Sequence, residues 1–216
     1  MVNIFIDGKE GTTGLQIFER LGKRNDVSIV TLPEELRKDP AARKECINGA
    51  DIVFLCLPDA AARESVSLCE NERVRILDAS TAHRTNPAWA YGFPELSKEH
   101  RRRIAEEKRV AVPGCHASGF ISLVYPLIAG GIIAPDYPLV CHSVTGYSGG
   151  GKKMIAEYES EGRSIALDSP RQYALGQAHK HLPEMKAVCG LLYAPTFQPI
   201  VSDYYCRMWV PVPLPV

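Results

Sequence analysis

The sequence lacks any long run of apolar residues and any excess of charge of one sign. No stretch approaches the ~18 apolar residues that a helix needs to span a bilayer. The first residues, 1–7, show neither a basic start nor a small-residue cleavage site, which argues against a signal peptide. Basic and acidic residues number 25 each, so net charge provides no attraction to nucleic acid or anionic membrane. We therefore expect a cytoplasmic protein that binds neither.

The sequence also lacks a CxxC pair, and its cysteines are odd in number. Seven cysteines stand at positions 46, 56, 69, 115, 141, 189 and 206. This pattern argues against a disulfide framework and against a cysteine zinc site, and it favours reduced thiols in a cytosol. An HxH pair, His179 and His181, has no evident third ligand nearby. We therefore expect no metal site.

No internal repeat or low-complexity tract is visible, and 216 residues suffice for one or two domains. Short apolar runs alternate with helical segments through the first half, at residues 2–6, 27–32, 51–57, 74–78 and 109–112. Strands that alternate with helices at this spacing predict a parallel sheet covered by helices on both faces. We predict a doubly wound, Rossmann-like α/β domain over residues 1–115.

The character of the chain changes after residue 115. A buried helix is expected over 117–129, followed by strand-like segments at 139–145, 191–200 and 204–213 without clear helices between them. These segments predict a second, α+β domain over residues 116–216, with a mainly antiparallel sheet. The sequence stops just after a strand, so we expect this sheet to be incomplete, with an unpaired apolar edge.

A glycine-rich turn follows the first predicted strand. Gly8, Gly11 and Gly14 form a GxxGxxG pattern, in which glycine lets the backbone approach a pyrophosphate at the start of a helix. The alternative is a tight turn without a ligand. The second strand lacks a terminal acidic residue, and Arg37 and Lys38 follow it, so the pattern leans toward NADP rather than NAD.

Cys115 differs from the other cysteines in its position. It stands at a strand-to-helix junction, where unpaired N–H groups and the positive end of a helix stabilise a thiolate. The same N–H groups could hold an oxyanion. The other cysteines are interpreted as structural, since Cys56 and Cys141 fall in predicted strands and Cys46 and Cys69 in predicted helices. We predict that Cys115 is a nucleophile and that the HxH histidines supply an acid or base.

These segments together closely resemble the N-acetyl-gamma-glutamyl-phosphate reductase family of arginine biosynthesis, in its shorter type. The resemblance extends to about Pro213 and is carried by residues 8–14, 78–84, 92–96, 114–115, 145–152 and 179–184. The glycine turn is shared with aspartate-semialdehyde dehydrogenases. The GFPEL segment at 92–96 and the HKHLPE segment at 179–184 are the specific ones.

The resemblance implies reduction of N-acetyl-gamma-glutamyl phosphate by NADPH, through a thioester on Cys115, to N-acetylglutamate 5-semialdehyde and phosphate. His179 is then the acid/base, with Tyr173 near it, and His181 is the second choice. The implied NADP(H)-binding residues are Gly8, Gly11, Thr12, Thr13, Gly14, Ser80, Ser148, Gly149 and Gly150. For the last three, contact with the substrate phosphate is an equally open reading.

The resemblance further implies a small-molecule substrate and a homo-oligomer, either a dimer or a tetramer. Arg84 and Lys152 could bind the substrate carboxylate, or could be ordinary surface or ion-pair cations. Two other functions stay open. One is a dehydrogenase that acts on aspartyl phosphate. The other is a truncated, catalytically silent protein that binds nucleotide, since members of the family are longer than this chain.

Overall fold

The computed structural model describes residues 1–9 and 11–215, except for the side chain of Thr12. The chain divides into two compact units, Met1–Pro113 and Gly114–Val216. The division falls two residues before the domain boundary expected from the sequence. As a result, Cys115 belongs to the second unit, where it is the first residue of a helix.

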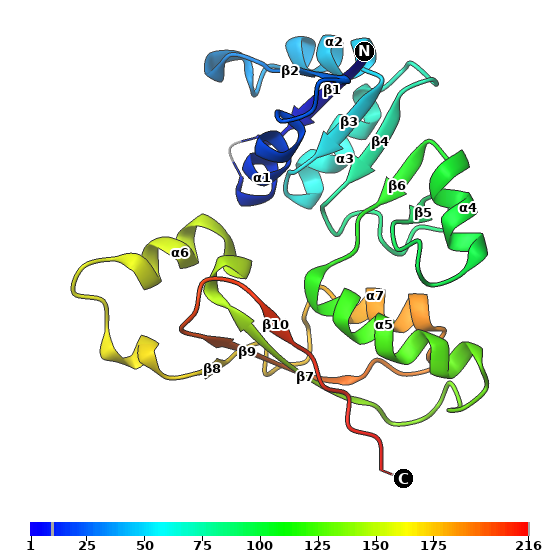
Figure 1. The fold of residues 1–216 in the computed structure, drawn as a ribbon, viewed down its shortest axis with the longest axis vertical. Helices are drawn as coiled ribbons and strands as arrows, with labels where there is room; N and C mark the ends of the chain where they lie inside the picture. The colour runs from blue at the N-terminus through cyan, green and yellow to red at the C-terminus, as the bar shows by residue number, and fades with distance from the viewer. Residues whose placement is uncertain (10, 216) are drawn as a thin grey trace. The chain divides into compact units, whose positions relative to one another are not determined.

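The first unit contains a six-stranded parallel sheet with the order β2-β1-β3-β4-β6-β5. Its strands are β1 (Val2–Asp7), β2 (Val27–Val30), β3 (Ile52–Leu55), β4 (Arg75–Asp78), β5 (Ala90–Tyr91) and β6 (Arg109–Ala111). The strand β2 lies on one side of β1, and β3 lies on the other (Figure 1). This reversal of direction is the doubly wound arrangement predicted from the sequence.

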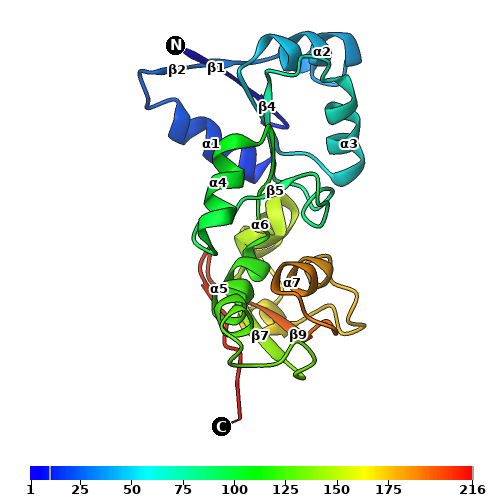
Figure 2. The ribbon, with the colours of Figure 1, turned by 90° about the vertical axis from the view of Figure 1, so that its right-hand side faces the viewer.

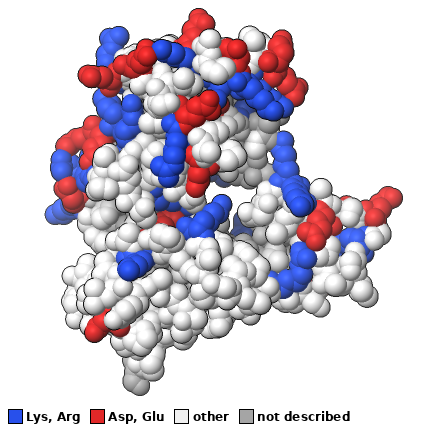
Figure 3. Space-filling view, turned by 180° about the vertical axis from the view of Figure 1, so that it is seen from behind, with Lys and Arg blue, Asp and Glu red and all other residues white. Residues whose placement is uncertain are grey.

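Helices cover both faces of this sheet. The helices of the first unit are α1 (Thr12–Leu21), the 3₁₀ turn η1 (Glu34–Leu36), α2 (Pro40–Gly49), α3 (Asp59–Leu68) and α4 (Lys98–Glu106). Figure 2 shows α1 and α4 on one side of the sheet and α2 and α3 on the other. On the face shown in Figure 3, basic and acidic side chains are interspersed.

The core of the first unit forms where the central strands meet α2 and α3. Phe5, Val53 and Ile76 are buried on neighbouring strands, and Ile47 from α2 and Ala62 from α3 pack with them. Full burial of a large aliphatic or aromatic side chain contributes about 1.5–3 kcal/mol. The packing therefore fixes the carboxyl ends of β1 and β3, where the glycine turn lies.

Two helices of the first unit begin at residues whose side chains cap them. The Asp39 carboxylate accepts a hydrogen bond from the Ala42 N–H at 2.7 Å, and Pro40 occupies the first helical position of α2. Ser97 caps α4 by accepting from the His100 N–H at 3.2 Å. Such caps satisfy N–H groups that have no partner within the helix.

The second unit combines helices with a four-stranded sheet of order β10-β7-β9-β8. Its strands are β7 (Val140–Gly146), β8 (Arg171–Gln172), β9 (Thr196–Ser202) and β10 (Met208–Trp209). Its helices are α5 (Cys115–Ala129), the 3₁₀ turns η2 (Tyr147–Gly150) and η3 (Ile165–Asp168), α6 (Gly151–Glu159) and α7 (Leu182–Cys189).

The second sheet is mixed: two of its three described strand pairs are antiparallel, as expected, and the third is parallel. The edge pairs, β10 with β7 and β8 with β9, are antiparallel but only two residues long. The central pair, β7 with β9, is parallel over seven residues. The chain between them passes through α6, β8 and α7, and such a long crossover returns the chain in its original direction.

The helices α6 and α7 lack strong sequence signals, so the sequence shows no clear helices here. The first follows Gly150 and has no side-chain cap. The second has eight residues, with Pro183 in its first turn and Gly190 ending it at a φ of +67°. Proline is tolerated in a first turn, and glycine favours the left-handed C-cap. Among the described residues, none of the helices has the length and apolar character needed to span a membrane.

Candidate active site

The glycine turn after β1 is shaped by close backbone contacts. Gly8 has a φ of +88°, and a Cβ atom there would lie 2.4 Å from the Cys56 carbonyl oxygen. A Cβ on Gly14 would lie 2.5 Å from the Gly8 carbonyl oxygen. Both positions therefore exclude larger side chains. Gly11 has room, because its nearest contact would be 3.5 Å away, and its N–H closes the turn onto Gly8 at 3.1 Å.

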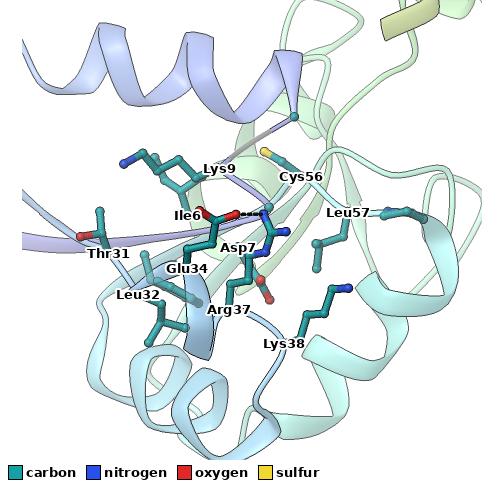
Figure 4. A pocket seen from close by; sticks show the side chains of 14 residues that line it. Ile6, Asp7, Lys9, Thr31, Leu32, Glu34, Arg37, Lys38, Cys56 and Leu57 are labelled. Carbon is teal, nitrogen blue, oxygen red and sulfur yellow. Dashed lines mark ion pairs between the residues drawn. The ribbon is translucent and has the colours of Figure 1, made fainter. Parts of the chain in front are cut away.

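A cavity of about 600 Å³ lies beside this turn in the first unit (Figure 4). Gly8 and Gly11 line it together with Thr31, which follows β2, and the cations Lys9, Arg37 and Lys38. In the close view, the Arg37 guanidinium turns toward the Glu34 carboxylate, with Nη1 and Oε1 3.4 Å apart. Both side chains are largely exposed, so this ion pair contributes little to stability.

The start of α1 fits an anionic group. Gly11 is its N-cap and offers no side-chain acceptor, and the first turn carries no acidic residue. Its N–H groups and the positive end of the helix dipole are therefore available to a phosphate. A smaller cavity of about 180 Å³ is lined by Gly11, Thr13 and Ala79, among others. The side chain of Thr12, also predicted to bind the cofactor, lies outside the described residues.

Ser80 lines neither cavity, and its hydroxyl makes hydrogen bonds within the first unit. Its hydroxyl donates to the Asp78 carboxylate at 2.8 Å and accepts from the Ala82 N–H at 3.1 Å. The His83 ring approaches the same carboxylate at 2.6 Å. Arg84 is also internal, since it donates to the carbonyl oxygens of Val112 and Ala79. These contacts stabilise the segment after β4.

Substitution of Gly14 by alanine should weaken nucleotide binding at least about 10-fold, because the new methyl group would displace the backbone of Gly8 and Lys9. Fluorescence titration with NADPH measures the change. Gly49→Ala is the matched control, since nothing lies within 4 Å of a Cβ at that helix position. Equal affinities in the two variants would show that the turn does not bind the cofactor.

Cys115 opens α5 with an exposed thiol. The preceding residue, Gly114, is the N-cap and provides no side-chain hydrogen bond. Its own N–H donates to Oε1 of Glu184 at 2.8 Å, and this carboxylate is only 1% exposed. Glu184 thus fixes the backbone immediately before Cys115. The thiol stands at the positive end of a 15-residue helix, as the strand-to-helix junction predicts.

His116 links Cys115 to the other predicted residues. The ring is 3% exposed, with Nδ1 2.7 Å from the Ser143 hydroxyl and Nε2 2.9 Å from the Tyr173 hydroxyl. The ring centroids of His179 and His181 each lie 5.5 Å from that of His116. The structure therefore brings Tyr173, His179 and His181 together around the residue that follows Cys115.

The two histidines of the HxH pair lie in the turn before α7. The His179 Nδ1 accepts a hydrogen bond from the His181 N–H at 3.2 Å, and the two rings are 4.8 Å apart. Burial and the positive charge of Lys180 lower the pKa of His179 below its ordinary value. His179 is therefore neutral at pH 7 and able to accept a proton. Among the described residues, no group of three His, Cys, Asp or Glu is arranged to hold a metal ion.

The loop that carries Tyr173 and His179 is held against β9. The Gln177 side chain donates to the Phe197 carbonyl oxygen and accepts from the Phe197 N–H, both at 2.8 Å. Gln177 therefore binds the strand as a neighbouring strand would. Its φ of +53° is unusual for a residue other than glycine, which is typical of segments that position functional groups.

The remaining predicted residues, Ser148, Gly149 and Gly150, form the 3₁₀ turn η2 after β7. The Ser148 N–H is used within the unit, where it donates to the Tyr205 carbonyl oxygen at 2.9 Å. In the described residues, no hydrogen bond or ring contact joins this turn to the histidine cluster. Lys152 lies exposed near the start of α6.

Sequence reasoning assigned no role to His116, Ser143 or Glu184. His116 directly follows the predicted nucleophile, and Glu184 belongs to the HKHLPE segment, so the sequence offered a signal for both. Nothing in the sequence indicated a role for Ser143, because it is a single serine in a predicted strand, 27 residues away from His116.

Protonation of the His116 ring should make the free energy of unfolding depend on pH. Burial is the largest cause that lowers its pKa from 6.5 to about 4, so the unfolded chain takes up this proton first as the pH falls. Stability is therefore full above pH 6.5 and is lost as the pH falls toward 4, by about 3 kcal/mol for this group.

Urea unfolding at pH 7.0 and at pH 4.5 measures this loss. His116→Gln lacks the titrating ring and should lose about 2–3 kcal/mol less than the unmodified chain between the two values. A pH dependence that is the same in both proteins would contradict the assignment.

Two family models match the chain, one for each unit. The model described as "Semialdehyde dehydrogenase, NAD binding domain" matches residues 19–104. The model described as "Semialdehyde dehydrogenase, dimerisation domain" matches residues 115–211. Solved structures agree in fold. Aspartate semialdehyde dehydrogenase II from Vibrio cholerae has a TM-score of 0.67 at 12% identity, over 98% of this chain and 73% of that one.

A second solved structure, aspartate semialdehyde dehydrogenase with NADP from Candida albicans, has a TM-score of 0.62 at 13% identity, over 100% of this chain and 73% of that one. The two family models, together with the fold, place the chain in the semialdehyde dehydrogenase class.

Curated relatives narrow this class. The N-acetyl-gamma-glutamyl-phosphate reductase of Chelativorans sp. (strain BNC1) is 51% identical over 98% of the chain. N-acetyl-gamma-glutamyl-phosphate reductase 2 of Pseudomonas putida is 48% identical over 98%. The chain spans 67% of the length of each. This chain belongs to the N-acetyl-gamma-glutamyl-phosphate reductase family.

Proposed function

We propose that this chain reduces N-acetyl-gamma-glutamyl phosphate to N-acetylglutamate 5-semialdehyde, with release of phosphate, in the biosynthesis of arginine. The observation that carries the proposal is the exposed Cys115 thiol at the start of α5, beside the cluster of His116, Tyr173, His179 and His181. The names of the relatives at about 50% identity support the substrate.

Cys115 is the proposed nucleophile. Its thiolate attacks the acyl carbon of the substrate, and the C–O bond to the phosphate group breaks. The resulting thioester stays activated toward reduction and is held in place for it. Reduction gives a thiohemiacetal, which collapses to the aldehyde and frees Cys115. His179 is the proposed acid/base for this collapse, with His181 as the second choice and Tyr173 close to both.

The cofactor assigned here is NADP(H), which supplies the hydride when it is bound. The glycine turn would hold its pyrophosphate, because the backbone of Gly8 and Gly14 leaves no room for side chains and the start of α1 is open. Arg37 and Lys38 line the neighbouring cavity, where they would neutralise a 2′-phosphate.

Self-association is proposed as well, as a homodimer or homotetramer. The second unit matches a dimerisation-domain model over residues 115–211. One face of its sheet carries the register partners Val144, Ile200 and Trp209, and Trp209 is 65% exposed. An apolar sheet face of this kind suits a second copy of the chain.

The test runs the reaction in reverse, with the full chain, phosphate, NADP and N-acetylglutamate 5-semialdehyde. NADPH absorbance should rise, and aspartate semialdehyde should give a far smaller rate. Preference for the aspartyl substrate would reject the proposed substrate. NADPH binding without turnover of either aldehyde would instead indicate a nucleotide-binding protein without catalysis.

A further inference from the structure

A chain of two hydrogen bonds crosses the second unit behind Cys115. It starts at the Ser143 hydroxyl on β7, which lies 2.7 Å from Nδ1 of His116. It continues from Nε2 of the same ring to the Tyr173 hydroxyl, 2.9 Å away. Serine, neutral histidine and tyrosine can each donate and accept, so two opposite directions of donation are chemically available.

The surroundings of Ser143 determine the direction of donation along the two hydrogen bonds. Its side chain is 0% exposed, and in the described residues His116 is the only hydrogen-bond partner of its hydroxyl. If the hydroxyl accepted from His116, its own proton would be buried without an acceptor. An unsatisfied buried donor is costly, whereas a spare lone pair costs less. Ser143 therefore donates to Nδ1 of His116.

The direction of the first hydrogen bond determines the direction of the second, because the two share the His116 imidazole. Burial lowers the pKa of His116 to about 4, so the ring is neutral at pH 7 and carries a single proton. Because Nδ1 accepts from Ser143, this proton resides on Nε2 and is donated to the Tyr173 oxygen. In the part of the chain that the structure describes, Tyr173 has no other side-chain hydrogen-bond partner. Its own O–H proton is consequently left for another acceptor.

We propose that Ser143 and His116 are positioning residues, which hold the imidazole as the Nε2–H tautomer and leave the Tyr173 O–H free to donate to the acyl oxygen on Cys115. This inference rests on the proposed function for the identity of the acceptor. Tyr173 is suited to donation, because burial and the negative charge of Cys115 raise its pKa to about 12 and keep it protonated. A fixed donor aimed at a developing oxyanion stabilises the transition state.

The tautomer of His116 is measured directly by ¹⁵N NMR of the labelled full chain at pH 7. A substitution is needed only to assign the signals. His116→Gln identifies the His116 signals by their loss. The proton should reside on Nε2, with Nδ1 unprotonated. A ring protonated at Nδ1 alone would overturn the proposal, whatever reaction the protein catalyses.

Ser143→Ala tests the origin of the tautomer. Without the serine proton, the Nε2–H form loses its hydrogen bond at Nδ1, so its preference over the Nδ1–H form should decrease and the population of Nδ1–H should rise above that of the unmodified chain. Ser122→Ala is the matched control, because that serine is exposed on the same helix as His116 and binds the Gly119 carbonyl. An unchanged ratio of the two His116 tautomers in Ser143→Ala would show that Ser143 does not determine the tautomer.

Kinetics test the consequence for the reaction. Ser143→Ala should lower kcat about 2- to 10-fold with little change in KM, because a smaller fraction of the protein holds Tyr173 free to donate; this is less than the roughly 10²- to 10³-fold cost of removing an oxyanion donor outright. In a Tyr173→Phe background, the same substitution should have no further effect, because its role passes through Tyr173. Equal losses in both backgrounds would mean a general structural role. Absence of turnover in the unmodified chain would contradict the proposed function, while the NMR result still decides the tautomer.

Discussion

Replacing Cys115 with serine should lower the reductase rate by roughly 10⁴-fold or more, the scale of loss when an enzyme's nucleophile is removed. A serine hydroxyl stays protonated at neutral pH and is a far weaker nucleophile than a thiolate. The side chain is exposed at the start of α5, so the substitution leaves no cavity in the core. The rate of NADPH oxidation measures the loss.

Two controls make this result specific to the covalent step. Cys206→Ser changes another exposed cysteine of the same unit and should retain full activity. The Cys115→Ser variant should bind NADPH as tightly as the unmodified chain, because the glycine turn belongs to the first unit. Full activity of Cys115→Ser would refute the thioester mechanism, even if the substrate were correct.

Replacing Arg43 with methionine should destabilise the first unit by about 3–5 kcal/mol, the usual effect of removing one partner from a buried ion pair. Arg43 is 5% exposed, and its Nη2 lies 3.1 Å from the carboxylate of Asp7, the last residue of β1. Ser65 from α3 donates to the same carboxylate at 2.8 Å. Methionine fills much of the volume but leaves the Asp7 charge buried without its cation.

Urea unfolding, followed by the fluorescence of Trp89, measures this effect. A Trp209→Phe background removes the only other tryptophan, so the signal reports the first unit alone. Arg102→Met is the matched control. Its ion pairs with Glu99 and Glu106 are exposed on α4, and their loss should cost less than about 1 kcal/mol.

A second substitution separates the buried charge from simple loss of packing. Asp7→Asn combined with Arg43→Met removes both charges, and it should recover part of the stability lost in Arg43→Met alone. If the double variant were less stable than the unmodified chain by the sum of the costs of Asp7→Asn and Arg43→Met, the two residues would not be coupled. The Asp7 carboxylate also precedes Gly8, so Arg43→Met should weaken NADPH binding.

Local patterns were sufficient to predict the first unit. Most strands are short apolar runs, and several helices begin at a cap or a proline that the sequence shows, as α2 does at Asp39 and Pro40. Because the strand and helix segments alternate closely, few topologies can bury their apolar faces. The two-residue strand β5 was missed, because Ala90–Tyr91 is too short to produce a periodic signal.

The second unit depends more on contacts between distant residues. The parallel pairing of β7 with β9 joins Val140 to Thr196 across 55 intervening residues, and no local pattern specifies such a pairing. The helix α7 is short, and a proline in the sequence is as consistent with the end of a helix as with its first turn. Sequence alone therefore predicted an α+β unit with a mainly antiparallel sheet, and it did not reveal the parallel central pair.

The sequence by itself determined the doubly wound fold, the glycine turn and the position of Cys115 at the start of a helix, because each depends on residues adjacent in the chain. Only the tertiary structure decided what surrounds the cysteine. His116 meets Ser143 and Tyr173, which lie 27 and 57 residues away, and Glu184 reaches Gly114 across 70. Such contacts arise from packing of α5 against the second sheet and α7, and burial in that packing sets the protonation of His116.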